Sequence, residues 1–303
     1  MKQQLPTEPK KRRYLGSLYI ILSAVLFGFM PLLTKIAYAH GSNSYTAAFG
    51  RFLFGSLFLG LINLCKGGAH LRLDKRYVLP ILKMAIPYAL VPILLYESYN
   101  HIGSGLATTL HFTYPAAVLL ILFLFCRERP KAVQLLCVAF SVGGMVLLYK
   151  PGEAVAPLGV LFAVASGIVY AVYITLLGQS IAKELPPLVL AFWISTLSVI
   201  EIGLAALLTG NLTFQLDAVG WGAEIILALS ATVLALVLFQ QGVILCGPVK
   251  ASLFSTFEPI TSIAVGIAIP ASLHANLIRI EDANIHLGQR SIVPEAGDIA
   301  VRS

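Results

Sequence analysis

Long apolar runs, separated by short breaks that hold most of the charged residues, form the main pattern of this chain. Each run is about 20 residues long, enough to cross the ~30 Å hydrocarbon core of a bilayer as a helix. No alternating ten-residue pattern indicates a β-barrel, so the backbone groups in lipid must pair inside helices. We therefore predict an all-α integral membrane protein with nine spans, at about residues 15–38, 45–65, 78–99, 104–126, 132–149, 157–178, 188–209, 220–245 and 250–269.

The basic residues between these spans lie almost entirely on one side of the predicted bundle. The side of the N-terminus carries 14 of them, whereas the loops on the other side hold Lys150 alone. The fourteen are Lys2, Lys10, Lys11, Arg12, Arg13, Lys66, Arg72, Lys75, Arg76, Arg127, Arg129, Lys131, Lys183 and Lys250. Because cytoplasmic loops are enriched in Lys and Arg, we expect residues 1–14 to form a basic cytoplasmic N-terminus.

Similar short sequences recur at a nearly constant distance along the chain. Residues 15–19 align with 158–162 at an offset of 143, and Ile102-Gly103 and Tyr114-Pro115 align with Cys246-Gly247 and Glu258-Pro259 at an offset of 144. Each repeat unit would hold five helices, at 15–150 and from 157 onward, and an odd number of helices inverts the second unit relative to the first. Inverted repeats around a site near the bilayer midplane are typical of secondary transporters.

The second unit is expected to be incomplete. By the repeat, the fifth helix should recur near residues 276–292, but that segment contains four charged residues and several amides. We therefore expect the second repeat to end at about 269, with residues 270–303 as a non-spanning, aberrant tail of the kind that a truncation or frameshift produces. The tenth helix is then missing.

Composition agrees with a membrane protein and excludes several other classes. The chain is 58% hydrophobic and only 12% charged, with a mean hydropathy of +0.85, whereas soluble domains are about 25% charged. The net charge of +7 sits between apolar runs, without the basic stripe that nucleic-acid binding requires. The four cysteines have no metal-ligand spacing, so neither a metal nor another cofactor is expected.

An ordered set of short motifs resembles the EamA branch of the drug/metabolite transporter superfamily. The set consists of Ser23 and Gly28, Gly50-Arg51-Phe52, residues 107–115 followed by Arg127-Glu128-Arg129, and residues 239–242 followed by Phe257-Glu258-Pro259. The resemblance covers residues 15 to about 269. It implies a ten-helix transporter of small organic solutes with a central cavity between the two halves, and this chain departs from it by lacking the final helix.

Several polar residues inside the apolar runs are candidates for the path of a solute. Glu258 precedes Pro259, and an intramembrane carboxylate next to a helix-breaking proline is a candidate for a cavity or coupling role. The alternative is a local hydrogen bond. The repeat equivalent is Tyr114-Pro115, and His111 lies one turn earlier on the same face, where it either lines the path or forms an interhelical hydrogen bond.

The remaining candidates have similar alternatives. Arg51 either contacts an anionic solute or pairs with a carboxylate such as Glu97, and Lys35 can snorkel to the interface instead. Gln240 and Gln241 either line the path or bond to the next helix. A row of small residues favours close helix packing; the row consists of Gly16, Ala24 and Gly28 in the first span and Gly159, Ala163, Gly167 and Ala171 in the sixth.

These features favour a secondary transporter, with export of a small metabolite or drug-like solute by alternating access as the leading hypothesis. No nucleotide-binding GxxxxGK[ST] loop is present, and no GxSxG or HExxH motif indicates an enzyme. A membrane-embedded enzyme and an inactive transporter fragment are the alternatives. The expected partners are a small-molecule solute, lipid and a proton or other coupling ion, but no nucleic acid. Short loops suggest a bacterial inner membrane, and the oligomeric state is open.

Overall fold

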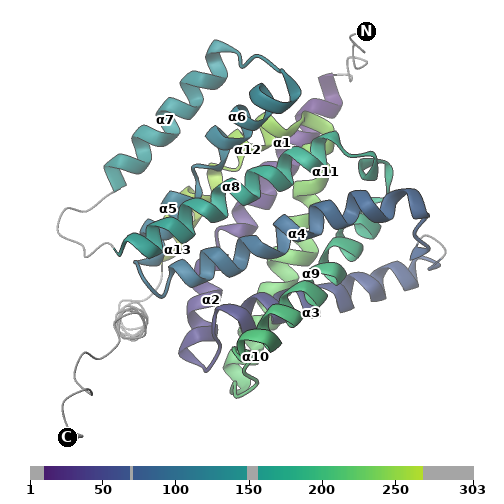
Figure 1. Ribbon diagram of the computed structural model, residues 1–303, viewed down its shortest axis with the longest axis vertical. Helices are drawn as coiled ribbons and strands as arrows, with labels where there is room; N and C mark the ends of the chain where they lie inside the picture. Colours follow the sequence, from purple (N-terminus) through teal and green to yellow (C-terminus); the bar gives the residue numbers. More distant parts are fainter. Residues whose placement is uncertain (1–9, 69–70, 149–155, 269–303) are drawn as a thin grey trace, which may run out of the picture.

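The computed structural model describes residues 10–68, 71–148 and 156–268, and this part of the chain is built from helices without a β-strand. Figure 1 shows the arrangement. The helices are α1 (Lys10–Phe27), α2 (Met30–Ala39), α3 (Ser44–Cys65), α4 (Lys75–Ser98), α5 (Ser104–His111), α6 (Tyr114–Cys126), α7 (Ala132–Leu148), α8 (Pro157–Gln179), η2 (Ile181–Glu184), α9 (Pro187–Thr209), α10 (Ala218–Leu227), η3 (Ala228–Ala235), α11 (Leu236–Cys246), α12 (Pro248–Phe254) and α13 (Phe257–Ala268).

Eight segments of the described chain are long and apolar enough to cross a membrane, and their bounds follow the predicted spans closely. Many large apolar side chains face outward, such as Leu208 (88% exposed) and Phe125 (80% exposed), as expected of a surface in contact with lipid. The prediction of an all-α integral membrane protein is confirmed. The fifth predicted span, 132–149, is present as α7, but with 17 residues it is shorter than the other eight.

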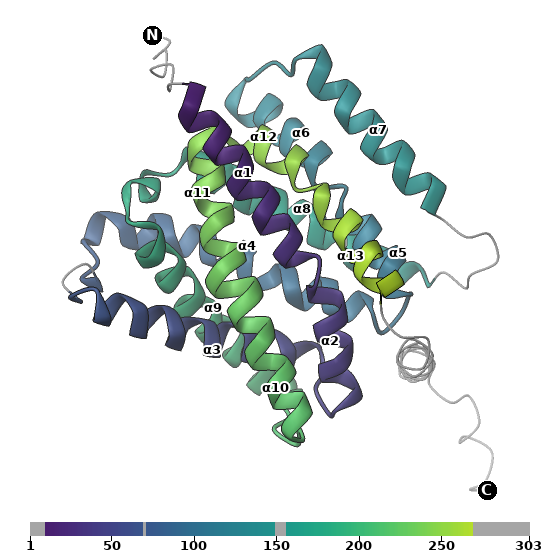
Figure 2. The same ribbon diagram turned by 180° about the vertical axis from the view of Figure 1, so that it is seen from behind.

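The two halves of the chain interleave. The most extensive helix contacts join α4 to α8, α1 to α11 and α3 to α9, so each joins the first half to the second. Figure 2 shows α1 lying along α11, and in both views α7 lies at the edge of the bundle. A site between these pairs is therefore built by both halves.

The pairing is consistent with the predicted repeat. Under the repeat, α1 corresponds to α8, α3 to α9 and α4 to α11. When each helix is replaced by its equivalent, the α4–α8 pair becomes the α11–α1 pair, and the α3–α9 pair is unchanged. A side chain at Gly16 would meet Leu245 and Cys246, and one at Gly159 would meet His101 and Ile102, with the nearest atoms at 2.8 and 2.7 Å. These contacts are equivalent under the repeat offset. The inverted orientation itself stays a prediction.

Three spans are broken near their middle, and in each case the second half-helix has a proline among its first three residues. The breaks lie between α1 and α2, between α5 and α6 and between α12 and α13, and the prolines are Pro31, Pro115 and Pro259. Proline is tolerated in the first turn of a helix because it has no N–H group, but it interrupts a helix that precedes it. These three half-helices therefore start inside the bundle.

A fourth irregularity lies between α10 and α11. Residues Ala228–Ala235 form a π-helix, η3, inside the continuous helical segment Ala218–Cys246. A π-helix contains i→i+5 hydrogen bonds and usually occurs as a short bulge, often at a functional site. The proposed tail 270–303 and the missing tenth helix lie outside the described residues, and the domain boundaries stay predictions.

Candidate functional site

A cavity lies between the two halves, next to all three broken spans. Its volume is about 380 Å³ including the space at its open side. The lining residues come from both halves and are Phe27, Met30, Arg51, Tyr88, Val91, Pro92, Leu95, His111, Tyr170 and Glu258. The cavity therefore combines one cation, one carboxyl group and one imidazole with aromatic and aliphatic walls. Arg51, His111 and Glu258 were candidates from the sequence, and the structure brings these three together.

Arg51 is buried, and neutral groups hold its guanidinium. Its Nε donates to Oγ1 of Thr232 at 3.2 Å, its Nη2 donates to the hydroxyl of Tyr88 at 3.0 Å, and its Nη1 contacts Sδ of Met30 at 3.2 Å. Its Cζ also lies 4.9 Å from the ring centroid of Phe52. No carboxylate of the described residues forms an ion pair with Arg51 within 4.0 Å. A buried cation with neutral partners keeps the capacity to bind an anionic group.

Glu258 stands at the start of α13 and is only 8% exposed. Its backbone N–H donates to the carbonyl of Ser255 at 2.9 Å. Across the described parts of the chain, no ion pair within 4.0 Å joins its carboxyl group to a basic side chain. Burying a carboxyl group inside a membrane protein is costly, so this position is a functional candidate by its chemistry. Pro259 follows it but does not line the cavity.

His111 ends α5 and forms an interhelical hydrogen bond. Its Nδ1 lies 2.8 Å from Oγ of Ser166, and Ser166 donates its own proton to the carbonyl of Ala163 at 2.6 Å. A hydroxyl has one proton to donate, so Nδ1 of His111 is the donor in this contact. In the neutral ring Nε2 is then the acceptor. His111 therefore forms an interhelical hydrogen bond with α8 and also lines the cavity, so the two alternatives from the sequence do not exclude each other.

An aromatic layer surrounds these polar groups. The Tyr170 ring stacks on Tyr173 at 5.9 Å and on Phe239 at 5.7 Å, and Tyr173 lies 4.5 Å from Tyr88. Tyr114 lies behind the cavity, 5.0 Å from the ring of Tyr170. This layer places apolar ring surface close to Arg51, His111 and Glu258.

Three further candidates, Gln240, Gln241 and Pro115, lie outside the cavity lining. Gln240 is fully buried and donates from Nε2 to the hydroxyl of Tyr173 at 3.1 Å. Gln241 is half-buried, and Pro115 is buried in the first turn of α6. None of these three residues lines the cavity, so they do not contact its contents directly.

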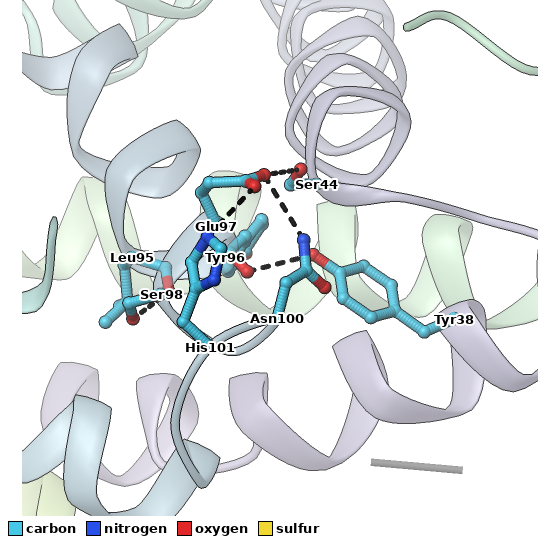
Figure 3. Close-up of polar contacts among 8 residues, drawn as sticks. All are labelled: Tyr38, Ser44, Leu95, Tyr96, Glu97, Ser98, Asn100 and His101. Carbon is cyan, nitrogen blue, oxygen red and sulfur yellow. Dashed lines mark hydrogen bonds and ion pairs between the residues drawn. The ribbon is translucent and has the colours of Figure 1, made fainter. Parts of the chain in front are cut away.

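Glu97 does not pair with Arg51, which corrects one alternative from the sequence. Figure 3 shows Glu97 in a network at the end of α4. Its Oε2 accepts from Oγ of Ser44 at 2.6 Å and from Nδ2 of Asn100 at 3.2 Å, and its Oε1 lies 3.7 Å from Nε2 of His101. This Glu97 network (Ser44, Glu97, Asn100 and His101) joins the start of α3 to the end of α4.

Comparison with known proteins identifies the first half. Residues 14–150 match the model of the EamA-like transporter family. This segment belongs to that family. The resemblance to EamA transporters expected from the sequence is therefore confirmed.

The relatives of this EamA-like chain are transporters by name. An uncharacterized transporter of Synechocystis sp. is 26% identical over 293 aligned residues, which cover 86% of this chain and 87% of the relative. An uncharacterized transporter of Archaeoglobus fulgidus is 27% identical over 252 residues, covering 83% and 86%. A solved crystal structure superimposes with a TM-score of 0.67 at 17% identity, covering 92% of this chain and 99% of the other, and supports the fold alone. Together, family and relatives indicate a membrane transporter rather than an enzyme.

Sequence reasoning missed the aromatic and aliphatic walls of the EamA-like cavity. Phe27, Tyr88 and Tyr170 are ordinary members of apolar helices, and only tertiary packing distinguishes them from lipid-facing residues. One signal was available for Tyr88, because α4 contains Pro87 and Pro92 in its interior. Among the described residues there is no cluster of three or more metal-ligating side chains.

Proposed function

We propose that this protein is a secondary transporter that exports a small amphipathic organic solute by alternating access through the cavity between its halves. The observation that carries the proposal is the joint presence of Arg51 and Glu258 on one aromatic-walled cavity, without an ion pair between them in the described structure. A solute with a charged group and an apolar body matches both parts of this wall. The family and the relatives support transport in general.

The charged groups would act on different parts of the solute. The remaining N–H groups of Arg51 are donors for a carboxylate or similar anion. Glu258 is an acceptor for an ammonium group or, alternatively, the carrier of a coupling proton. The rings of Phe27 and Tyr170 would cover the apolar body.

Alternating access requires the halves to rock against each other around the cavity. The breaks beside His111 and Glu258 lie where such motion would concentrate, because fewer regular helix hydrogen bonds resist bending there. The Glu97 network would close one end of the cavity, by joining α3 to α4 at that end.

The basic residues support a cytoplasmic N-terminus in a bacterial inner membrane. In that orientation the Glu97 network and the loop that contains Thr213 face outward. A cysteine introduced at Thr213 should therefore react with an impermeant maleimide in intact cells, whereas one at Gly68, in a loop on the other side, should not. The reverse pattern would overturn the orientation.

Binding measurements in lipid nanodiscs test the solute class. We would titrate three probes of matched size by calorimetry: 3-phenylpropionate (anion), 2-phenylethylamine (cation) and phenylalanine (both charges). We expect Arg51→Gln to weaken binding of the anion and Glu258→Gln to weaken binding of the amine, whereas the exposed control Arg76→Gln changes neither. Absence of binding by all three probes, or equal binding by all variants, would contradict the proposal.

A further inference from the structure

The π-helix η3 lies against the cavity arginine, and two hydrogen bonds from the first half of the chain hold it. Oγ of Ser23 donates to the carbonyl of Ala235 at 2.8 Å, and Nε of Arg51 donates to Oγ1 of Thr232 at 3.2 Å. Ser23 and Thr232 are fully buried. Both hydrogen bonds are therefore shielded from water. In such a low-dielectric interior a hydrogen bond is stronger than in water and fixes the geometry of its partners more firmly.

The close approach of α3 to η3 depends on Gly55. A side-chain carbon at Gly55 would lie 2.4 Å from Cγ2 of Thr232. Glycine thus lets Thr232 reach the α3 surface that carries Arg51, one turn earlier along the same helix. Gly55 on α3 and the hydroxyl-bearing Thr232 on η3 therefore meet at the same point of the contact between these two helices.

The extra residue of the π-turn determines which side chain meets Arg51. A change from π to α geometry removes the i→i+5 register, and one residue of an α-helix corresponds to about 100° of rotation and 1.5 Å of rise. Such a change would move Thr232 and the carbonyl of Ala235 relative to each other. The bonds from Arg51 and Ser23 would then not form together.

The nitrogens of the Arg51 guanidinium have different partners in this arrangement. Nε is occupied by Thr232, which lies outside the cavity lining, whereas Arg51 itself and Tyr88, the partner of Nη2, line the cavity. An anion that binds through the Nη groups needs the guanidinium plane to be fixed, because the bidentate geometry is directional. A hydroxyl at Nε supplies this constraint without adding a competing charge.

We propose that Thr232 is a positioning residue for Arg51, and that the π-turn of η3 holds it in place so that Arg51 selects solutes with an anionic group. The inference rests on the proposed function only in taking Arg51 as the group that meets the solute. It adds a specificity determinant in the second half of the chain that does not itself line the cavity.

The test compares Thr232→Val, which keeps the shape but removes the hydroxyl, with Thr232→Ser, which keeps the hydroxyl. In nanodiscs, we expect Thr232→Val to bind 3-phenylpropionate roughly tenfold more weakly, the effect of losing one hydrogen bond to a charged group. Binding of 2-phenylethylamine should stay within about twofold of wild type, and Thr232→Ser should restore the anion affinity. A structural defect would weaken both probes alike, which would overturn the inference.

A second readout needs no solute. Phenylglyoxal modifies arginines, and mass spectrometry can follow its reaction at Arg51 relative to the exposed Arg76. We expect Thr232→Val to raise this ratio several-fold, because the guanidinium loses a partner, and Thr232→Ser to leave it near the wild-type value. An unchanged ratio in Thr232→Val overturns the positioning role. If the ratio rises as expected but the wild type binds no probe, the proposed solute class fails and the positioning role stands.

Discussion

Arg51 of α3 and Glu258 of α13 line the same cavity, yet no ion pair within 4.0 Å joins them in the described structure. Arg51 is held by Thr232, Met30 and Tyr88 instead. A basic and an acidic side chain that share a buried wall without an ion pair leave both groups able to bind something else. This relationship separates the cavity from an ordinary packed interface between membrane helices.

The bond between Ser44 and Glu97 should control access to one end of the cavity. We would replace Cys65, Cys126, Cys137 and Cys246, introduce Leu95→Cys in the cavity wall, and measure labelling by an impermeant maleimide from the side of the Glu97 network. Ser44→Ala removes one hydrogen bond to a charged group, so we expect labelling to be roughly tenfold faster. The control is Ser56→Ala, because among the described residues Ser56 bonds only to the carbonyl of Leu53 within its own helix. Equal rates in the two variants would rule out a closing role.

Gly167 lets α8 pass the break between α5 and α6. A side-chain carbon there would lie 2.4 Å from the carbonyl oxygen of His111 and 2.9 Å from Oγ1 of Thr113. Gly167→Ala should therefore destabilise the protein by about 1–3 kcal/mol, the usual cost of overpacking. In Gly222→Ala the new methyl group meets nothing within 4 Å. We therefore expect no loss of stability, and a gain in stability of up to ~1 kcal/mol from helix propensity. Thermal unfolding in detergent distinguishes the two, and similar losses would contradict this account of Gly167.

Asp217, in the loop before α10, should give a small pH-dependent contribution to stability. The backbone N–H of Gly220 and the side chain of His40 hold the pKa of its carboxyl group below the ordinary value of 3.8. A carboxyl group with a lowered folded-state pKa stabilises the fold above its unfolded pKa, and this contribution is lost as the pH falls through the folded value. The loss therefore lies below about pH 3.8.

Asp217→Asn keeps an oxygen that can cap α10 but does not titrate. The difference in melting temperature between wild type and Asp217→Asn should be constant near neutral pH and should shrink as the pH falls below 3.8. Parallel curves down to pH 3 would show that the interaction between Asp217 and its partners does not contribute to stability.

The sequence was most informative where a single polar residue stands inside an apolar run. Arg51, His111 and Glu258 are polar groups in apolar runs, and the cost of placing such groups in lipid is enough to indicate a shared interior site. The spans follow from hydropathy for the same reason. Proline positions also mark the breaks before α6 and α13, because proline interrupts a helix locally.

The rest depends on tertiary contacts that one sequence does not specify. Tyr88 and Tyr170 cannot be distinguished from lipid-facing aromatic residues by their spacing alone. Hydropathy does not distinguish i→i+4 from i→i+5 hydrogen bonds, so η3 and the contact of Thr232 with Arg51 were not predicted. The pairing of Glu97 with Ser44 rather than with Arg51 likewise depends on how α3 and α4 meet.

The central claim, that the cavity between the halves opens in turn to each side of the membrane, is tested most directly by labelling Leu95→Cys from both sides. In proteoliposomes of defined orientation, with the four native cysteines replaced, an impermeant maleimide would be applied either outside or inside. We predict labelling from each side, with Ser44→Ala shifting reactivity toward the side of the Glu97 network at the expense of the other. Labelling from one side only, unchanged by Ser44→Ala, would contradict alternating access and favour an inactive fragment.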